Sequence, residues 1–160
     1  MINLERLNQA IAIMKRAGVI DMTTWQGEVE VGCATTEAEL HSCGNSACFA
    51  GWVAIAPEFK KVGGKHLSNS GAPIFDGYTG YYAIAEWLEA EGELHNEVIE
   101  LLVTGEGAVL DSTIQWLESK DIQIVTNKQE PDRLYTYVHL NGWRNYKADD
   151  VIKILEALRD

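Results

Sequence analysis

YAIAEWLEAEGELHNEVIELLVTGEGAVLDSTIQWLES, residues 82–119, is the stretch of this sequence that decides the fold. Its apolar residues recur three or four positions apart, and glycines separate the repeats. This spacing is typical of helices that bury one face. We therefore predict three helices, over Tyr82–Ala90, Leu94–Val103 and Val109–Ser119, with a turn at residues 105–107 between the last two.

Helical patterns continue on both sides of this stretch. Leu4–Arg16 and Ala148–Leu158 each place apolar residues on one face, which predicts an amphipathic helix at each end of the chain. Ala47–Ala56 is uniformly small and apolar and is followed by Pro57, so we expect a short helix that is buried on most sides and ends near the proline.

Strand patterns are fewer and shorter. Glu28–Val31 alternates apolar and polar residues, as a short strand does. Ile122–Thr126 and Leu134–Leu140 are rich in β-branched and aromatic residues and flank a polar connection, which predicts a hairpin. Lys60–Tyr82 contains many turn-forming residues, so we expect a long loop there.

Length and composition set the fold class. The 160 residues are 46% hydrophobic and 23% charged, values typical of a globular protein with a buried core. We predict a single domain over residues 1–160, of the α+β class, mainly α, with a small antiparallel β-hairpin or sheet. The first residues lack the apolar run of a secretory signal, and no stretch is apolar enough to span a membrane, so we expect a cytoplasmic protein.

The charge distribution is strongly polarised. The net charge is −11, and no Lys or Arg occurs between His66 and Ser119. Those 54 residues hold ten acidic residues, which leaves 14 acidic and 13 basic residues in the rest of the chain. One third of the sequence therefore carries nearly all of the net charge.

The most distinctive motif is HSCGNSACFAGW, residues 41–52. It resembles a family of small phage and bacterial proteins of unassigned function, whose pattern is Cys-Gly-Thr-x-x-Cys-x-Ala-Gly followed by Trp or His, commonly downstream of a motif like Asp21-Met22-Thr23-Thr24-Trp25. Asn45 stands where Thr is usual, and the region from Ile122 to Tyr146 has no counterpart. The resemblance implies a mobile-element origin and a mostly helical fold, and it assigns no catalytic or binding residue.

Three interpretations of the cysteines in this motif stay open. In the first, Cys43 and Cys48 are small buried residues at the entrance of a helix, and Gly51 permits close packing. Trp25 and Trp52 are then core residues whose indole N–H groups find hydrogen-bond partners.

The second interpretation is a zinc site. Cys33, His41, Cys43 and Cys48 together offer the four sulfur and nitrogen ligands that tetrahedral zinc accepts. Their spacing is not that of a zinc finger, because Cys33 is distant from the other three in the sequence and only one residue separates His41 from Cys43. We therefore expect no cofactor, with zinc as the alternative.

The third interpretation is a cysteine hydrolase. Cys48 at a helix start would have its thiolate stabilised by free backbone N–H groups, with His139 as base and Asn141 as the group that orients it. His139 and Asn141 are equally explained as polar residues that face the solvent. Because no catalytic motif is recognised, we expect a binding protein rather than an enzyme.

The acidic third suggests the binding mode. Helices that present rows of carboxylates can compete with nucleic acid for a groove lined by Lys and Arg, and the same charge repels DNA and RNA from this protein. With the mobile-element resemblance, this suggests a nucleic-acid mimic that inhibits a host defence or nucleic-acid-processing protein, as an anti-CRISPR does. A merely solvated acidic face is the alternative. The expected partner-binding residues are Glu86, Glu89, Glu93, Glu97, Glu100, Tyr81 and Trp143.

Overall fold

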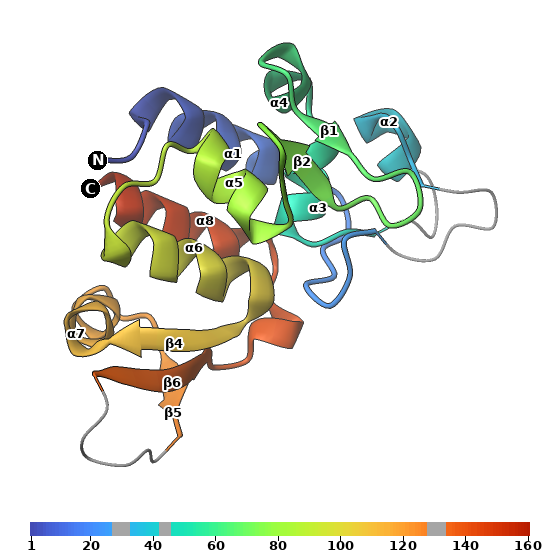
Figure 1. The fold of residues 1–160 in the computed structure, drawn as a ribbon. Helices are drawn as coiled ribbons and strands as arrows, with labels where there is room; N and C mark the ends of the chain where they lie inside the picture. The colour runs from blue at the N-terminus through green and yellow to red at the C-terminus, as the bar shows by residue number, and fades with distance from the viewer. Residues whose placement is uncertain (27–32, 42–45, 128–133) are drawn as a thin grey trace.

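The computed structural model describes residues 1–26, 33–41, 46–127 and 134–160. The strand predicted over Glu28–Val31 and the residue Cys43 lie outside these ranges. Within them the protein is an α+β fold, mainly helical, with two small antiparallel sheets (Figure 1). This confirms the fold class predicted from the sequence.

The described elements alternate between helices and short strands along the chain. The helices are α1 (Leu4–Arg16), α2 (Glu37–Leu40), α3 (Phe49–Ile55), α4 (Pro57–Lys61), α5 (Tyr81–Trp87), α6 (Glu93–Thr104), α7 (Asp111–Ser119) and α8 (Ala148–Arg159), with a 3-10 turn η1 (Trp143–Asn145). The strands are β1 (Lys65–His66), β2 (Pro73–Phe75), β3 (Tyr78–Thr79), β4 (Glu106–Leu110), β5 (Ile124–Thr126) and β6 (Tyr135–Leu140). None of these helices is long and apolar enough to cross a membrane.

The terminal helices α1 and α8 pack against each other, which brings the two chain ends side by side (Figure 1). Both were predicted, and the residues that set their boundaries are visible in the structure. The side chain of Asn3 caps α1 by accepting a hydrogen bond from the backbone N–H of Arg6 at 3.1 Å. The predicted apolar face of α8, which includes Val151 and Leu155, is buried.

Helix α3 lies in the core, and all seven of its residues are buried. Cys48 is its N-cap, with the sulfur accepting from the backbone N–H of Gly51 at 3.4 Å. A Cβ on Gly51 would lie 1.7 Å from the carbonyl oxygen of Trp25, so only glycine permits this packing. The predicted buried helix is confirmed, although Pro57 begins the next helix, α4, as its first residue.

The long loop predicted over Lys60–Tyr82 is partly wrong. It contains strands β1, β2 and β3, which form a three-stranded antiparallel sheet in that order. Asp76 and Gly77 join β2 to β3 with φ values of 46° and 83°. Positive φ at both central residues is the signature of a tight hairpin turn, for which Asp-Gly is a favoured pair. The many glycines in this segment therefore indicated turns between short strands rather than one long loop.

The second sheet contains a strand that the sequence analysis missed. Its order is β4-β6-β5, so the predicted hairpin partners β5 and β6 do pair, with Ile124 opposite Leu140. On the other side of β6 lies β4, where a turn and the start of a helix were expected. Gly105 ends α6 with φ of 85°, and Glu106–Leu110 then runs as a strand whose Gly107 and Val109 are buried. Helix α7 consequently begins at Asp111 rather than at Val109.

Candidate functional site

Four of the eight exposed acidic residues of the acidic third lie in the stretch from α5 to the first residue of α6. Glu86 follows Tyr82 by one turn of α5, and Tyr82 is 57% exposed. Glu89 comes after the end of α5, with φ of 52°. Glu91 lies in the connection that leads to α6, and Glu93 is the first residue of α6. The connection between α5 and α6 lies on the side of the molecule where the chain ends meet (Figure 1). We call Tyr82, Glu86, Glu89, Glu91 and Glu93 the acidic surface.

Two of these carboxylates are partly neutralised by the first residues of the chain. Glu89 lies 3.1 Å from the guanidinium of Arg6, and Glu91 lies 2.9 Å from the amino group of Met1. Glu86 and Glu93 form no ion pair with any described residue. The pair between Met1 and Glu91 is exposed on both sides and contributes little to stability, so Glu91 can exchange its partner for another. Arg6 is half-buried and also donates to the backbone carbonyl of Trp87 at 2.7 Å, so its pair with Glu89 is held more firmly.

Glu97 does not belong to the acidic surface, contrary to the sequence-based prediction. It is only 8% exposed. Its carboxylate accepts hydrogen bonds from the backbone N–H of Leu110, at 3.2 Å to each oxygen, and from the hydroxyl of Thr113. The side chain of Glu97 on α6 therefore points into the protein, and its carboxylate binds the residues where β4 ends and α7 begins.

Glu100 and Tyr81, which were also predicted to contact a partner, are only partly exposed to solvent. Glu100 is half-buried over Gly107 of β4, and burial together with the charge of Glu97 raises its pKa. Tyr81 is half-buried with its ring centre 4.0 Å from that of Tyr82. Because Tyr82 is the more exposed of this pair, it is the aromatic residue that a partner of the acidic surface would meet first.

The cysteine motif is structural in the part that is described. Cys48 is buried, and burial raises the pKa of its thiol to about 11. A nucleophilic cysteine needs the opposite shift. Cys48 and His139 also line different cavities. Trp52 is buried with its indole N–H donating to the carbonyl of Val19 at 3.1 Å, as the first interpretation predicted.

The zinc interpretation can be followed for three of its four ligands, because Cys43 lies outside the described residues. His41 packs its ring against Trp52 with centres 4.9 Å apart, Cys48 caps α3, and Cys33 is half-buried. Among the described residues, no three His, Cys, Asp or Glu side chains are grouped as metal ligands would be.

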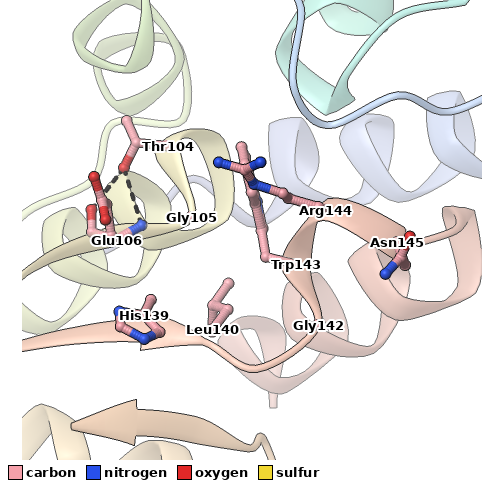
Figure 2. A pocket seen from close by; sticks show the side chains of 9 residues that line it. All are labelled: Thr104, Gly105, Glu106, His139, Leu140, Gly142, Trp143, Arg144 and Asn145. Carbon is pink, nitrogen blue, oxygen red and sulfur yellow. Dashed lines mark hydrogen bonds between the residues drawn. The ribbon is translucent and has the colours of Figure 1, made fainter. Parts of the chain in front are cut away.

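A cavity of about 450 Å³ opens where residues 104–106 meet residues 139–145, and we call it the polar chamber because five of its nine lining residues have polar or charged side chains. Figure 2 shows Thr104 and Glu106 on one side, Trp143 and Arg144 on the other, and His139 on strand β6 below. Glu106 and His139 are paired across strands β4 and β6. Sequence analysis had named Trp143 as a partner-binding residue and His139 as an alternative base, and the structure places both here.

Trp143 is held rigidly at the edge of this chamber. Its indole N–H donates to the carbonyl of Leu102 at 3.0 Å. Its ring lies against Gly105, where a Cβ would come within 2.5 Å of the ring and where φ is 85°. The conformation of Gly105 therefore serves two purposes, because it ends α6 and makes room for the indole.

A second cavity of about 300 Å³, which we call the apolar chamber, adjoins the polar chamber and shares Thr104 and Trp143 with it. Its other lining residues are Met22, Thr23, Thr24, Trp25, Cys48 and Val103. The lining of the second chamber is mainly apolar, and we refer to the two neighbouring chambers together as the groove. Sequence analysis did not single out Arg144, Glu106 or Thr104 as parts of such a groove.

Comparison with known proteins adds no family to this description. No family model matches the chain, and no curated protein or solved structure matches it either. The resemblance of residues 41–52 to a phage and bacterial family stays a prediction.

Proposed function

We propose that this chain is a non-enzymatic binding protein whose acidic surface engages a basic surface on a partner protein. The observation that carries the proposal is the exposure of Glu86 and Glu93, which form no ion pair with the described residues, within a 54-residue segment that contains no Lys or Arg. Glu89 and Glu91 add two further exposed carboxylates, and the ion pair of Glu91 is exposed on both sides and exchangeable.

The chemistry of this surface favours one class of partner. Proteins that bind nucleic acid line their grooves with Lys and Arg to neutralise phosphates, and exposed carboxylates on another protein are attracted to the same groups. The net charge of −11 repels DNA and RNA themselves. The partner in this proposal is therefore a nucleic-acid-processing protein, and this chain occupies its nucleic-acid groove.

The resemblance of the cysteine motif to phage and bacterial proteins supports a narrower version of the proposal. A protein of mobile-element origin that occupies such a groove would inhibit a host defence system, as an anti-CRISPR protein does. The acidic surface is separate from the buried part of the cysteine motif, because residues 47–52 lie in the core around α3 while the carboxylates are exposed to a partner.

The test is a capture experiment from a bacterial lysate with three tagged proteins. They are the natural chain, a variant with Glu86→Gln, Glu89→Gln and Glu93→Gln, and a control variant with Asp111→Asn, Glu118→Gln and Asp149→Asn. Both variants lose three exposed carboxylates, but the control loses them from α7 and α8. The proposal predicts a partner that the natural chain and the control retain and the first variant loses.

Competition with nucleic acid then tests the class of the partner. Adding duplex DNA or RNA to the captured complex should release this chain, because both would occupy the same basic groove. A partner that binds nucleic acid and this chain at the same time would contradict the groove-occupying role.

A further inference from the structure

Two side chains of opposite charge line the groove around Trp143. Glu106 is exposed on β4 and Arg144 is exposed on η1, and both line the polar chamber (Figure 2). Neither forms an ion pair with the other or with any other described residue. The Glu106 carboxylate accepts a hydrogen bond from the hydroxyl of Tyr137, but no cation among the described residues neutralises it. A cavity lined by this carboxylate and by the guanidinium of Arg144 is suited to a ligand that carries both charges.

The residues that lie beside these charges in the groove are held in place by hydrogen bonds and by packing. Trp143 is anchored by its hydrogen bond to Leu102 and by its packing on Gly105. The hydroxyl of Thr104 donates to the backbone carbonyl of Glu106 at 2.7 Å, which ties the end of α6 to the first residue of β4. Such preorganisation lowers the entropy that a ligand must lose on binding.

Beyond Trp143, the apolar chamber offers a place for a large apolar group. Met22, Trp25 and Val103 line it, and its volume of about 300 Å³ exceeds that of any apolar side chain. The polar chamber, at about 450 Å³, lies within the roughly 300–1,000 Å³ of small-molecule sites. The groove therefore matches a molecule with two charged groups and one apolar group.

We propose that this groove binds a small apolar zwitterion, an α-amino acid or a dipeptide with a large apolar side chain. Arg144 receives the carboxylate in a charge-assisted, two-pronged contact, and Glu106 receives the ammonium group. The side chain passes Trp143 and enters the apolar chamber. His139 and Asn145, which also line the polar chamber, supply further hydrogen-bonding groups.

Calorimetry with L-phenylalanine and with the dipeptide alanyl-phenylalanine tests which ligand binds. The two probes distinguish a free amino acid from a dipeptide. We expect one of them to bind with a Kd below about 1 mM. N-acetyl-phenylalanine, which lacks the ammonium group, and phenylalaninamide, which lacks the carboxylate, should each bind at least about 10-fold more weakly. Glycine, which lacks the apolar side chain, should not bind.

The protein side is tested with matched pairs of variants. Arg144→Gln and Glu106→Gln should each weaken binding at least about 10-fold, whereas Arg159→Gln and Glu118→Gln should leave it unchanged. The indole N–H resonance of Trp143, assigned by its loss in Trp143→Phe, should shift when ligand is added. Absence of binding by both probes would overturn the proposal, as would equal binding of the capped ligands or equal affinity of Arg144→Gln.

Discussion

The carboxylate of Glu97 on α6 accepts a hydrogen bond from the backbone N–H of Leu110, with both of its oxygens 3.2 Å from that nitrogen. Leu110 is the last residue of β4 and the N-cap of α7. The apolar side chain of Leu110 cannot accept hydrogen bonds from the free backbone N–H groups at the start of α7. The Glu97 carboxylate, which comes from α6, is attracted to the positive end of the α7 dipole. One acidic side chain thus joins three elements that follow each other along the chain.

Replacing Glu97 should therefore destabilise the protein far more than replacing an acidic residue of the surface. Glu97→Ala leaves the N–H of Leu110 and the hydroxyl of Thr113 without their partner, and we expect the free energy of unfolding to fall by about 2–3 kcal/mol. Glu93→Ala on the same helix should change it by less than about 0.5 kcal/mol. Urea unfolding of both variants checks this, and equal effects would contradict the buried role of Glu97.

Gly51 should tolerate no side chain. Its Cβ would lie 1.7 Å from the carbonyl oxygen of Trp25, which is backbone and cannot move aside cheaply. We expect Gly51→Ala to lower the free energy of unfolding by more than about 3 kcal/mol, beyond the usual range for overpacking. Gly107→Ala is the matched control, because there the nearest atom, in the side chain of Glu100, lies at 3.4 Å. Thermal melts of the two variants compare them, and similar melting temperatures would refute the close packing at Gly51.

Cys48 should be unreactive in the folded protein. Because burial raises the pKa of its thiol to about 11, almost no thiolate is present at neutral pH. In a variant with Cys33→Ser and Cys43→Ser, we expect iodoacetamide to label Cys48 at least about 100-fold more slowly in buffer than in urea. Mass spectrometry of the labelled protein measures both rates. Fast labelling of the folded variant would instead support a cysteine nucleophile.

Glu100 should destabilise the protein at neutral pH. Burial, and then the charge of Glu97, raises the pKa of Glu100 in the folded state, so its ionised form is less favourable there than in the unfolded chain. Glu100→Gln should therefore raise the melting temperature at pH 7. The gain should vanish as the pH falls below the unfolded pKa of about 4.3, where the carboxyl is protonated in both states. Glu93→Gln provides the control, and a gain independent of pH would contradict this explanation.

The helices that the sequence predicted best are those whose boundaries are marked by local residues. Leu4–Arg16 begins at a capping Asn3 and repeats apolar residues at helical spacing, so its bounds agree with α1. Strand β4 was missed because it contains only two buried positions, one of them Gly107, and exists as a strand through its pairing with β6. The Asp76–Gly77 hairpin carried a recognisable signal, but its strands are too short to show a pattern of their own.

The same missing strand explains the errors at the site. Glu97 was predicted to be exposed because the pattern of α6 alone does not show that β4 and α7 cover it. Trp143 was predicted as a contact residue, but its neighbours Glu106 and Thr104 come from a segment about 40 residues earlier in the sequence. No local pattern could indicate that these segments meet, since their contact depends on the order of strands in the second sheet.

The most direct test of the acidic surface is the affinity of the captured partner, measured against salt for the natural chain and both triple variants. We expect the variant with Glu86→Gln, Glu89→Gln and Glu93→Gln to bind at least about 10-fold more weakly at low salt and to lose most of the salt dependence. The control with Asp111→Asn, Glu118→Gln and Asp149→Asn should stay within about 2-fold of the natural chain. Equal affinities and equal salt dependence for all three proteins would contradict the proposed function.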